Sequence, residues 1–171
     1  TFSDDDERYD PTEDVNLPFR YALPAGIYYD GSIAYIARAY NTECFKYNIG
    51  VARVSTNPLK PGAFMACGNA TDGKELFFDA STNIQLTGNT VHIAWVKTNG
   101  THARNVPGLH YFDSSGCLMT VGRYQINNYT VVGKVYIHTT PDREGFHGWN
   151  PELNQYFQLA PEVEFEVIAC V

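Results

Sequence analysis

Two charged side chains near the middle of the chain have the chemistry of a site for a polar ligand. Asp113 begins a tight-turn sequence, residues 113–116, and Lys134 follows a glycine within the β-rich run from Tyr129 to Ile137. A carboxylate accepts hydrogen bonds from neighbouring hydroxyls, and an ammonium group donates them to neutral oxygens. Such charge-assisted bonds are stronger than bonds between neutral groups. The pair therefore predicts a site for a hydroxyl-rich ligand.

The pattern around Asp113 also occurs earlier in the chain, which indicates a tandem repeat. The segment 23–31 matches the segment 106–114, which lies 83 residues later, and Gly50 matches Gly133 at the same offset. Residues 35–38 match residues 120–123 two positions out of step. Repeats of this length determine the architecture of a chain. The first copy keeps an aspartate, Asp30, but has Val51 where the second copy has Lys134.

The spacing of apolar and turn residues predicts an all-β chain. The segment from Glu162 to Val167 alternates acidic and apolar residues, which is typical of an antiparallel strand with one face in water. No segment shows helical periodicity over ten residues, and short β-rich runs recur at turn spacing. We expect an acidic flexible arm at residues 1–16, a first repeat at 17–90 and a second at 91–171. Residues 139–151 are expected to form a loop.

The charge of the chain is concentrated at its start. The formal net charge is −7, and residues 1–14 hold seven acidic side chains against one arginine. The remaining chain is therefore close to neutral and has no predicted basic face. Since nucleic-acid binding depends on lysine and arginine side chains that neutralise phosphates, we expect no nucleic-acid partner. No apolar run approaches 18 residues, so we expect no membrane span.

Four cysteines form an even set without the CxxC spacing of zinc sites. Two disulfides with three possible connectivities are the simplest interpretation. We favour Cys44–Cys67 and Cys117–Cys170, because each bridge then stays close to its own repeat. Three glycosylation sequons support a secreted, extracellular protein; they begin at Asn69, Asn99 and Asn128. The first residue, Thr1, is unusual for a nascent chain and suggests a removed leader.

The repeated residues resemble those of the DM-nine repeat family. The first repeat supplies Pro24, Asp30, the segment 35–38, Gly50 and the Gly-Lys-Glu at 73–75; the second supplies Trp95, Pro107, Asp113, the Val-Gly-Arg at 121–123, the Gly-Lys-Val at 133–135 and the segment 165–168. The resemblance covers residues 20–171. It implies two pseudo-symmetric antiparallel β modules that exchange strands, with one sugar site in each module.

The family includes mannose-binding lectins, in which the sugar site is built on the aspartate after the first strand and the lysine of the Gly-Lys pair. Carried over to this chain, the resemblance assigns ligand binding to Asp113 and Lys134 in the second repeat. It assigns Asp30 in the first repeat, where the lysine is missing. Glu75 and Glu152 are the expected counterparts of a further family glutamate.

These residues also have plain structural interpretations. Aspartates are good turn residues, and Lys134 could be a solvated strand lysine. Arg38 and Arg123 are expected to form structural pairs rather than to bind ligand. A metal site from His138, Asp142 and His147 is not favoured, since none of the histidines has a metal-binding spacing. We find no nucleophile motif and no phosphate loop, so we expect neither enzymatic activity nor a cofactor.

Two functional hypotheses follow from the sequence. The first is a secreted, lectin-like protein that binds carbohydrate of the mannose type through Asp113 and Lys134. A single such site binds weakly, because water competes for each hydrogen bond, so a homodimer would restore multivalent binding. The second is a diverged secreted protein that acts through protein–protein interaction. An Asn128 glycan would lie between Arg123 and Lys134 in sequence and would crowd their pocket.

Overall fold

The computed structural model describes most of both repeats. The described residues are 7–8, 23–40, 47–56, 59–68, 71–79, 84–86, 93–114 and 116–170. Nearly all the regular structure in these ranges is β-strand, with one short 3-10 helix, η1 (Ala103–Asn105). The all-β prediction is therefore confirmed.

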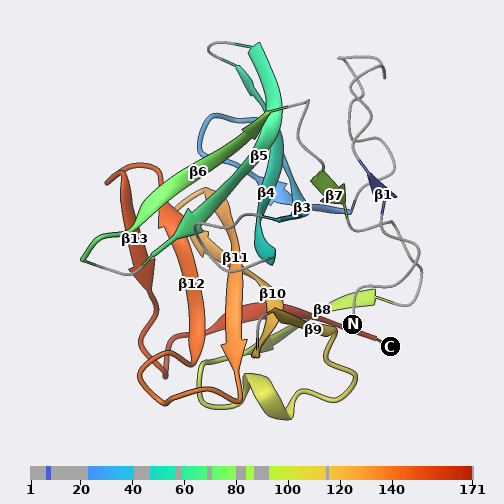
Figure 1. The fold of residues 1–171 in the computed structure, drawn as a ribbon, viewed down its shortest axis with the longest axis vertical. Coiled ribbons are helices and arrows are strands. Elements are labelled where there is room, and N and C mark those ends of the chain that lie inside the picture. Colours follow the sequence, from blue (N-terminus) through green and yellow to red (C-terminus); the bar gives the residue numbers. More distant parts are fainter. Residues whose placement is uncertain are drawn as a thin grey trace.

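The strands form two antiparallel sheets, which we call module one and module two (Figure 1). Module one contains β1 (Glu7–Arg8), β2 (Pro24–Ile27), β3 (Ile33–Tyr40), β4 (Tyr47–Thr56), β5 (Leu59–Cys67), β6 (Lys74–Asp79) and β7 (Ile84–Leu86). Module two contains β8 (Ile93–Thr98), β9 (Tyr111–Ser114), β10 (Cys117–Ile126), β11 (Tyr129–Ile137), β12 (Gly145–Asn150), β13 (Gln155–Gln158) and β14 (Phe165–Cys170).

The two modules have the same topology, which confirms the tandem pattern. The strand order is β1-β7-β3-β4-β5-β6 in module one and β13-β12-β11-β10-β14-β8 in module two, which is the same order written in reverse. The pairing register agrees too, because Ala37 faces Gly50 as Gly122 faces Gly133. In consequence Val51 and Lys134 occupy equivalent positions, as the sequence offset predicts.

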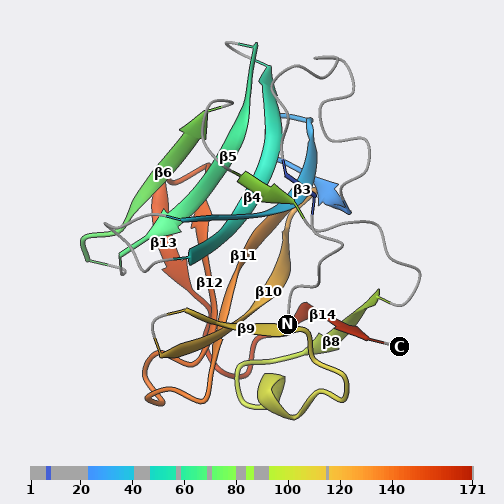
Figure 2. The ribbon, with the colours of Figure 1, turned by 45° about the vertical axis from the view of Figure 1, so that its right-hand side comes forward.

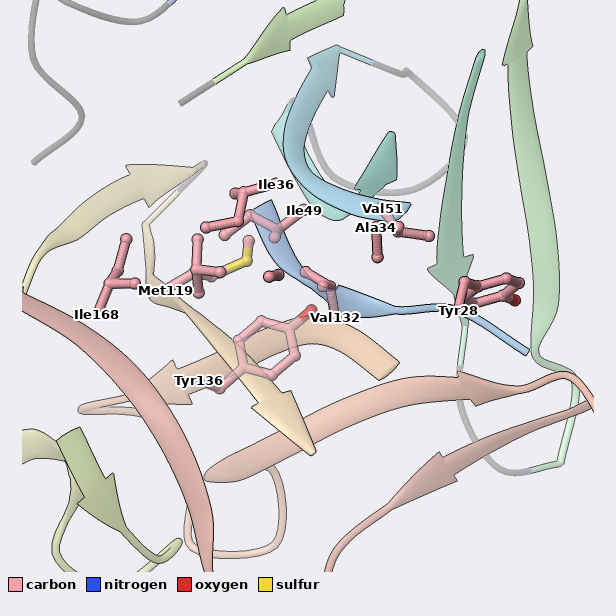
Figure 3. Close-up of a cluster of buried hydrophobic side chains, with 11 residues drawn as sticks. Tyr28, Ala34, Ile36, Ile49, Val51, Met119, Val132, Tyr136 and Ile168 are labelled. Atoms are coloured by element: carbon pink, nitrogen blue, oxygen red, sulfur yellow. The ribbon is translucent and has the colours of Figure 1, made fainter. Parts of the chain in front are cut away.

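The modules pack on each other through a shared apolar core. This core takes Ile36, Ile49 and Val51 from module one, and Met119 and Val132 from module two (Figure 3). The central strands β4 and β11 face each other across it. Each module has a second cluster on the other face of its sheet. Every residue of β11 is buried as a result, since both of its faces meet apolar layers.

The structure bears on three further expectations about the fold. Among the described residues the modules do not exchange strands. The first strand of each half pairs with the last strand of the same half, β1 with β7 and β8 with β14. Of the expected flexible arm, the structure describes only Glu7 and Arg8, which form β1 and pair with β7; the other residues of 1–16 lie outside the described residues, so the arm stays a prediction. The expected loop at 139–151 contains strand β12, whose glycines allow it to lie closely against β11.

Close strand approach at Gly133 generates a stability prediction. A Cβ added there would lie 2.2 Å from the backbone oxygen of His147, so β12 would have to move. At Gly148 the nearest atoms belong to side chains, Val131 at 2.9 Å and Phe146 at 3.0 Å, which shift more readily than a backbone oxygen in a strand. We expect Gly133→Ala to lower the free energy of unfolding by about 3 kcal/mol and Gly148→Ala by about 1 kcal/mol or less. Urea titration measures both, and equal losses would contradict the prediction.

Candidate functional site

The Asp113–Lys134 pair expected from the sequence is not formed. Asp113 pairs with Leu118 on β10, and Leu118 pairs with Ile137 on β11. Paired residues point to the same face of a sheet, and successive residues point to opposite faces. Lys134 lies three residues before Ile137, so its side chain leaves the opposite face from that of Asp113. The assignment of one ligand to both residues is therefore wrong.

Lys134 is enclosed between the two modules instead of facing solvent. Its side chain is 1% exposed, and its Nζ donates a hydrogen bond of 3.0 Å to the backbone oxygen of Ala66 on β5. The Nζ also lies 5.6 Å from the ring centroid of Tyr136 and 5.8 Å from that of Tyr156. Burial lowers the pKa of Lys134 to about 8. The lysine thus links the two modules, and a ligand in solution cannot reach it.

Lys134, Tyr136, His147 and Tyr156 together form what we call the amine cluster. The His147 Nε2 lies 2.8 Å from the Arg143 backbone oxygen, and its Nδ1 lies 2.6 Å from the Tyr156 hydroxyl. Since a carbonyl can only accept, the neutral ring donates from Nε2 and accepts the tyrosine proton at Nδ1. Burial lowers the pKa of His147 to about 4, against the opposing effect of the bond to Arg143. The histidine is therefore uncharged, and the four side chains of the cluster are buried.

Module one, where valine replaces the lysine, does form a pair between an aspartate and a cation. Asp30 lies in the turn between β2 and β3, and its Oδ2 is 2.5 Å from Nη1 of Arg53 on β4. Its Oδ1 accepts hydrogen bonds from the backbone and hydroxyl of Ser32, at 3.0 and 2.5 Å. Gly31 closes the turn with a φ of 85°, a conformation that glycine adopts without strain.

Arg53 is held between two aromatic rings beside a second carboxylate. Its guanidinium carbon lies 4.0 Å from the Tyr28 ring centroid and 3.9 Å from that of Phe64. Burial raises the pKa of Glu75, and the positive charge of Arg53 opposes that shift. The Arg53 Nε is buried and has no hydrogen-bond partner among the described residues. The structure therefore brings together Asp30 and Glu75, two residues expected from the sequence, around one arginine.

Arg53 was not expected to contribute, although the sequence holds a signal for it. Arg53 follows Val51 by two positions on β4, so both side chains leave the same face of the strand. A search for the missing cation along that face, rather than at the aligned position alone, would find it. The equivalent position in module two is Tyr136, which explains why the two modules place their cations differently.

An exposed tyrosine lies on the same turn as Asp30. The Tyr29 ring is 54% exposed and meets the Tyr129 ring edge-on, with centroids 5.1 Å apart. The Tyr129 hydroxyl is buried without a hydrogen bond of standard geometry among the described residues. Burial and the nearby Glu152 carboxylate raise its pKa to about 12. We call Tyr29, Asp30, Arg53, Tyr129 and Glu152 the turn site.

Glu75 and Glu152 are not counterparts, contrary to expectation. Glu75 on β6 pairs with Ala66, whose equivalent in module two is Trp149, and Trp149 pairs with Tyr156. Tyr156 is therefore the counterpart of Glu75. Glu152 lies in the turn between β12 and β13, where its backbone N–H donates to the Asn150 side chain at 3.0 Å. It reaches the turn site from the other module.

Arg123 has the structural role that the sequence suggested. Its Nε and Nη2 donate to the Glu166 carboxylate at 3.1 and 3.4 Å, and its Nη1 donates to the Ala25 backbone oxygen at 3.0 Å. The guanidinium carbon lies 4.2 Å from the Trp95 ring centroid. These contacts join β10, β14, β8 and β2, so Arg123 helps to fix the two modules to each other.

The disulfide prediction for module two is wrong. Cys117 and Cys170 are both free thiols. The pairing of Gly122 with Val167 places Cys170 opposite position 119 of β10. Cys117 lies two residues from that position, which is about 7 Å along the strand. Added to the strand spacing, this separation exceeds what a disulfide can bridge. Cys67 is disulfide-bonded, but Cys44 lies outside the described residues, so the Cys44–Cys67 pairing stays a prediction.

The described sequons lie in turns. Asn128 is exposed at the tip of the β10–β11 hairpin, directly before Tyr129 of the turn site. Lys134 lies six residues along the strand, about 20 Å away, so a glycan on Asn128 would crowd the turn site and not Lys134. The Asn99 side-chain oxygen accepts hydrogen bonds from the backbone N–H groups of Thr101 and His102, at 3.1 and 3.0 Å. Asn69 lies outside the described residues.

Comparisons with known proteins add no relative. No model of a known protein family matches the chain, and no curated protein matches it. In the part of the chain that the structure describes, no group of three or more acidic, histidine or cysteine side chains is placed to hold a metal ion. The same part has no helix with the length and apolar character needed to cross a membrane.

Burial of the amine cluster generates a prediction about acid stability. The pKa of His147 is lowered from 6.5 to about 4, so between these values the unfolded chain binds a proton that the folded chain does not. Stability therefore falls as the pH falls from 6.5 towards 4, by up to about 3 kcal/mol from this residue. We expect the double variant His147→Phe, Tyr156→Phe to lose this contribution when compared with Tyr156→Phe. Urea unfolding between pH 4 and 7 measures it, and parallel curves would contradict the prediction.

Proposed function

We propose that this protein is a secreted, lectin-like carbohydrate-binding protein whose sugar binds at the turn site. The observation that carries the proposal is the ion pair between Asp30 and Arg53 beside the exposed ring of Tyr29. Asp30 offers a partly exposed acceptor for a sugar hydroxyl, and the buried Arg53 holds its carboxylate in place. The tyrosine offers an apolar ring face for the C–H side of a pyranose.

The second module contributes the opposite wall of the proposed site. Glu152 provides an exposed carboxylate, and the Tyr129 hydroxyl lacks a hydrogen bond of standard geometry among the described residues. A neutral hexose such as mannose would donate hydroxyl protons to the Glu152 carboxylate, which also interacts with the buried Tyr129 hydroxyl. Because water competes for every such bond, one site gives weak binding, and clustered glycans or a homodimer would be needed for strong retention.

One observation favours the second hypothesis, a protein-interaction role. Ile27 and Ile33 face each other across β2 and β3, and they are 48% and 47% exposed. Together with Tyr29 they give the hairpin an apolar outer face of the kind found at protein interfaces. A protein partner would bury these isoleucines, whereas a monosaccharide at the turn site would not need them.

Retention on mannose-type glycans tests the proposal. We expect Tyr29→Ala and Glu152→Gln each to reduce retention on a glycan array about tenfold, because each removes one contact from a weak site. Both side chains are exposed, so the thermal unfolding midpoint should not change. Asp113→Asn is the matched control, since Asp113 is the module-two equivalent of Asp30 and is exposed. Loss of retention in the control alone would move the site to module two.

The sequon at Asn128 gives a separate prediction. A glycan there would stand directly beside Tyr129, so we expect Asn128→Asp or enzymatic deglycosylation to increase retention on the array. Removal of the Asn99 sequon by Asn99→Asp should leave retention unchanged. A blank array for every form of the protein would favour the protein-interaction hypothesis, and Ile27→Ser with Ile33→Ser would then be the variants to test for loss of a partner.

A further inference from the structure

Residues of η1, β9 and the segment between them line a separate hollow. Figures 1 and 2 show that η1 lies at the end of module two that points away from module one. The hollow is open to solvent and has a volume of about 390 Å³. This volume is within the range of small-molecule sites. None of its lining residues belongs to the turn site.

The floor of the hollow is apolar and continues into a core cluster. Val106, Leu109 and Leu118 line it, and all three pack against the second cluster of module two. Ile137, at the end of β11, completes the floor and is itself 3% exposed. The accessible lining of the hollow is more polar than apolar, so a ligand would cover a small apolar floor and make its remaining contacts with the polar groups at the mouth.

The mouth of the hollow is polar and has no carboxylate among its lining residues. It is lined by Arg104, His138 and the 42%-exposed ring of Tyr111. Two acidic side chains close to the mouth already have partners, and the partner of Glu144 is Arg104 itself. Glu144 lies 3.5 Å from Nη1 of Arg104, and an oxygen of Asp113 accepts a 2.9 Å hydrogen bond from the Gly116 backbone. Because the Arg104 side chain stays 45% exposed, it can accept a second anionic partner.

We propose that this hollow binds a small amphipathic carboxylate. The apolar body of the ligand packs on Val106, Leu109, Leu118 and Ile137, and its carboxylate meets the Arg104 guanidinium and the His138 ring at the mouth. A neutral or cationic ligand of the same length would bury the same area but gain no charge-assisted bond. The proposal does not depend on sugar binding, because the hollow and the turn site share no residue.

Calorimetric titration with three eight-carbon probes tests this charge selection. We expect octanoate to bind the full chain at least tenfold more tightly than octan-1-ol or octylammonium. Arg104→Gln should reduce octanoate affinity to that of octan-1-ol, and Arg104→Lys should retain most of it. Arg143→Gln is the control for net charge, since Arg143 is exposed in the neighbouring loop and does not line the hollow.

Backbone amide chemical shifts then locate the probe. Octanoate should move the signals of residues 104–111 and 137–138 and leave those of the β2–β3 turn unchanged. Equal affinity for the three probes, absence of measurable octanoate binding, or shifts confined to the turn site would each overturn the proposal. Loss of glycan retention in the turn-site variants would have no bearing on it, so the two sites can fail separately.

Discussion

The apolar core shared by the two modules is the constraint on which the other features depend. Each module is a strongly curved sheet with two apolar faces, and one face of each can be covered only by the other module. This is why β4 and β11 meet, why β11 is buried along its whole length, and why a lysine on its inner face has to find a partner within the protein. The surface left for ligands is restricted to turns and module ends.

Because of this shared core, Val51 and Lys134 have different roles although the repeat makes their positions equivalent. Equivalent positions in a repeat need not have equivalent surroundings, because the two modules meet through different side chains. At the equivalent positions Val51 and Lys134, the valine joins the shared core and the lysine donates to a backbone oxygen across the interface. The buried lysine therefore marks a junction, and the binding chemistry of module one depends on Arg53 and the turn that carries Asp30.

The sequence predicted the fold in more detail than it predicted the site. The offset between Gly50 and Gly133 fixed the equivalence of the central strands, because only glycine tolerates the neighbouring backbone at both positions. The site depends on which face of each strand turns inward, and that is decided by packing between segments far apart in the sequence. Asp113 and Lys134 were close in the chain but lie on opposite faces. Glu152 reached the turn site through a contact between modules that no local pattern encodes.

The closure of each module by its own first strand has a consequence for folding on the ribosome. In both modules the first strand pairs with the last, so the sheet is complete only when all of that half of the chain is available. Among the described residues, module one has its strands once residue 86 has been synthesised, whereas module two waits for Cys170. The inner face of module one then stays exposed during synthesis of the second half. Slow elongation or early termination there would leave a long-lived, aggregation-prone intermediate.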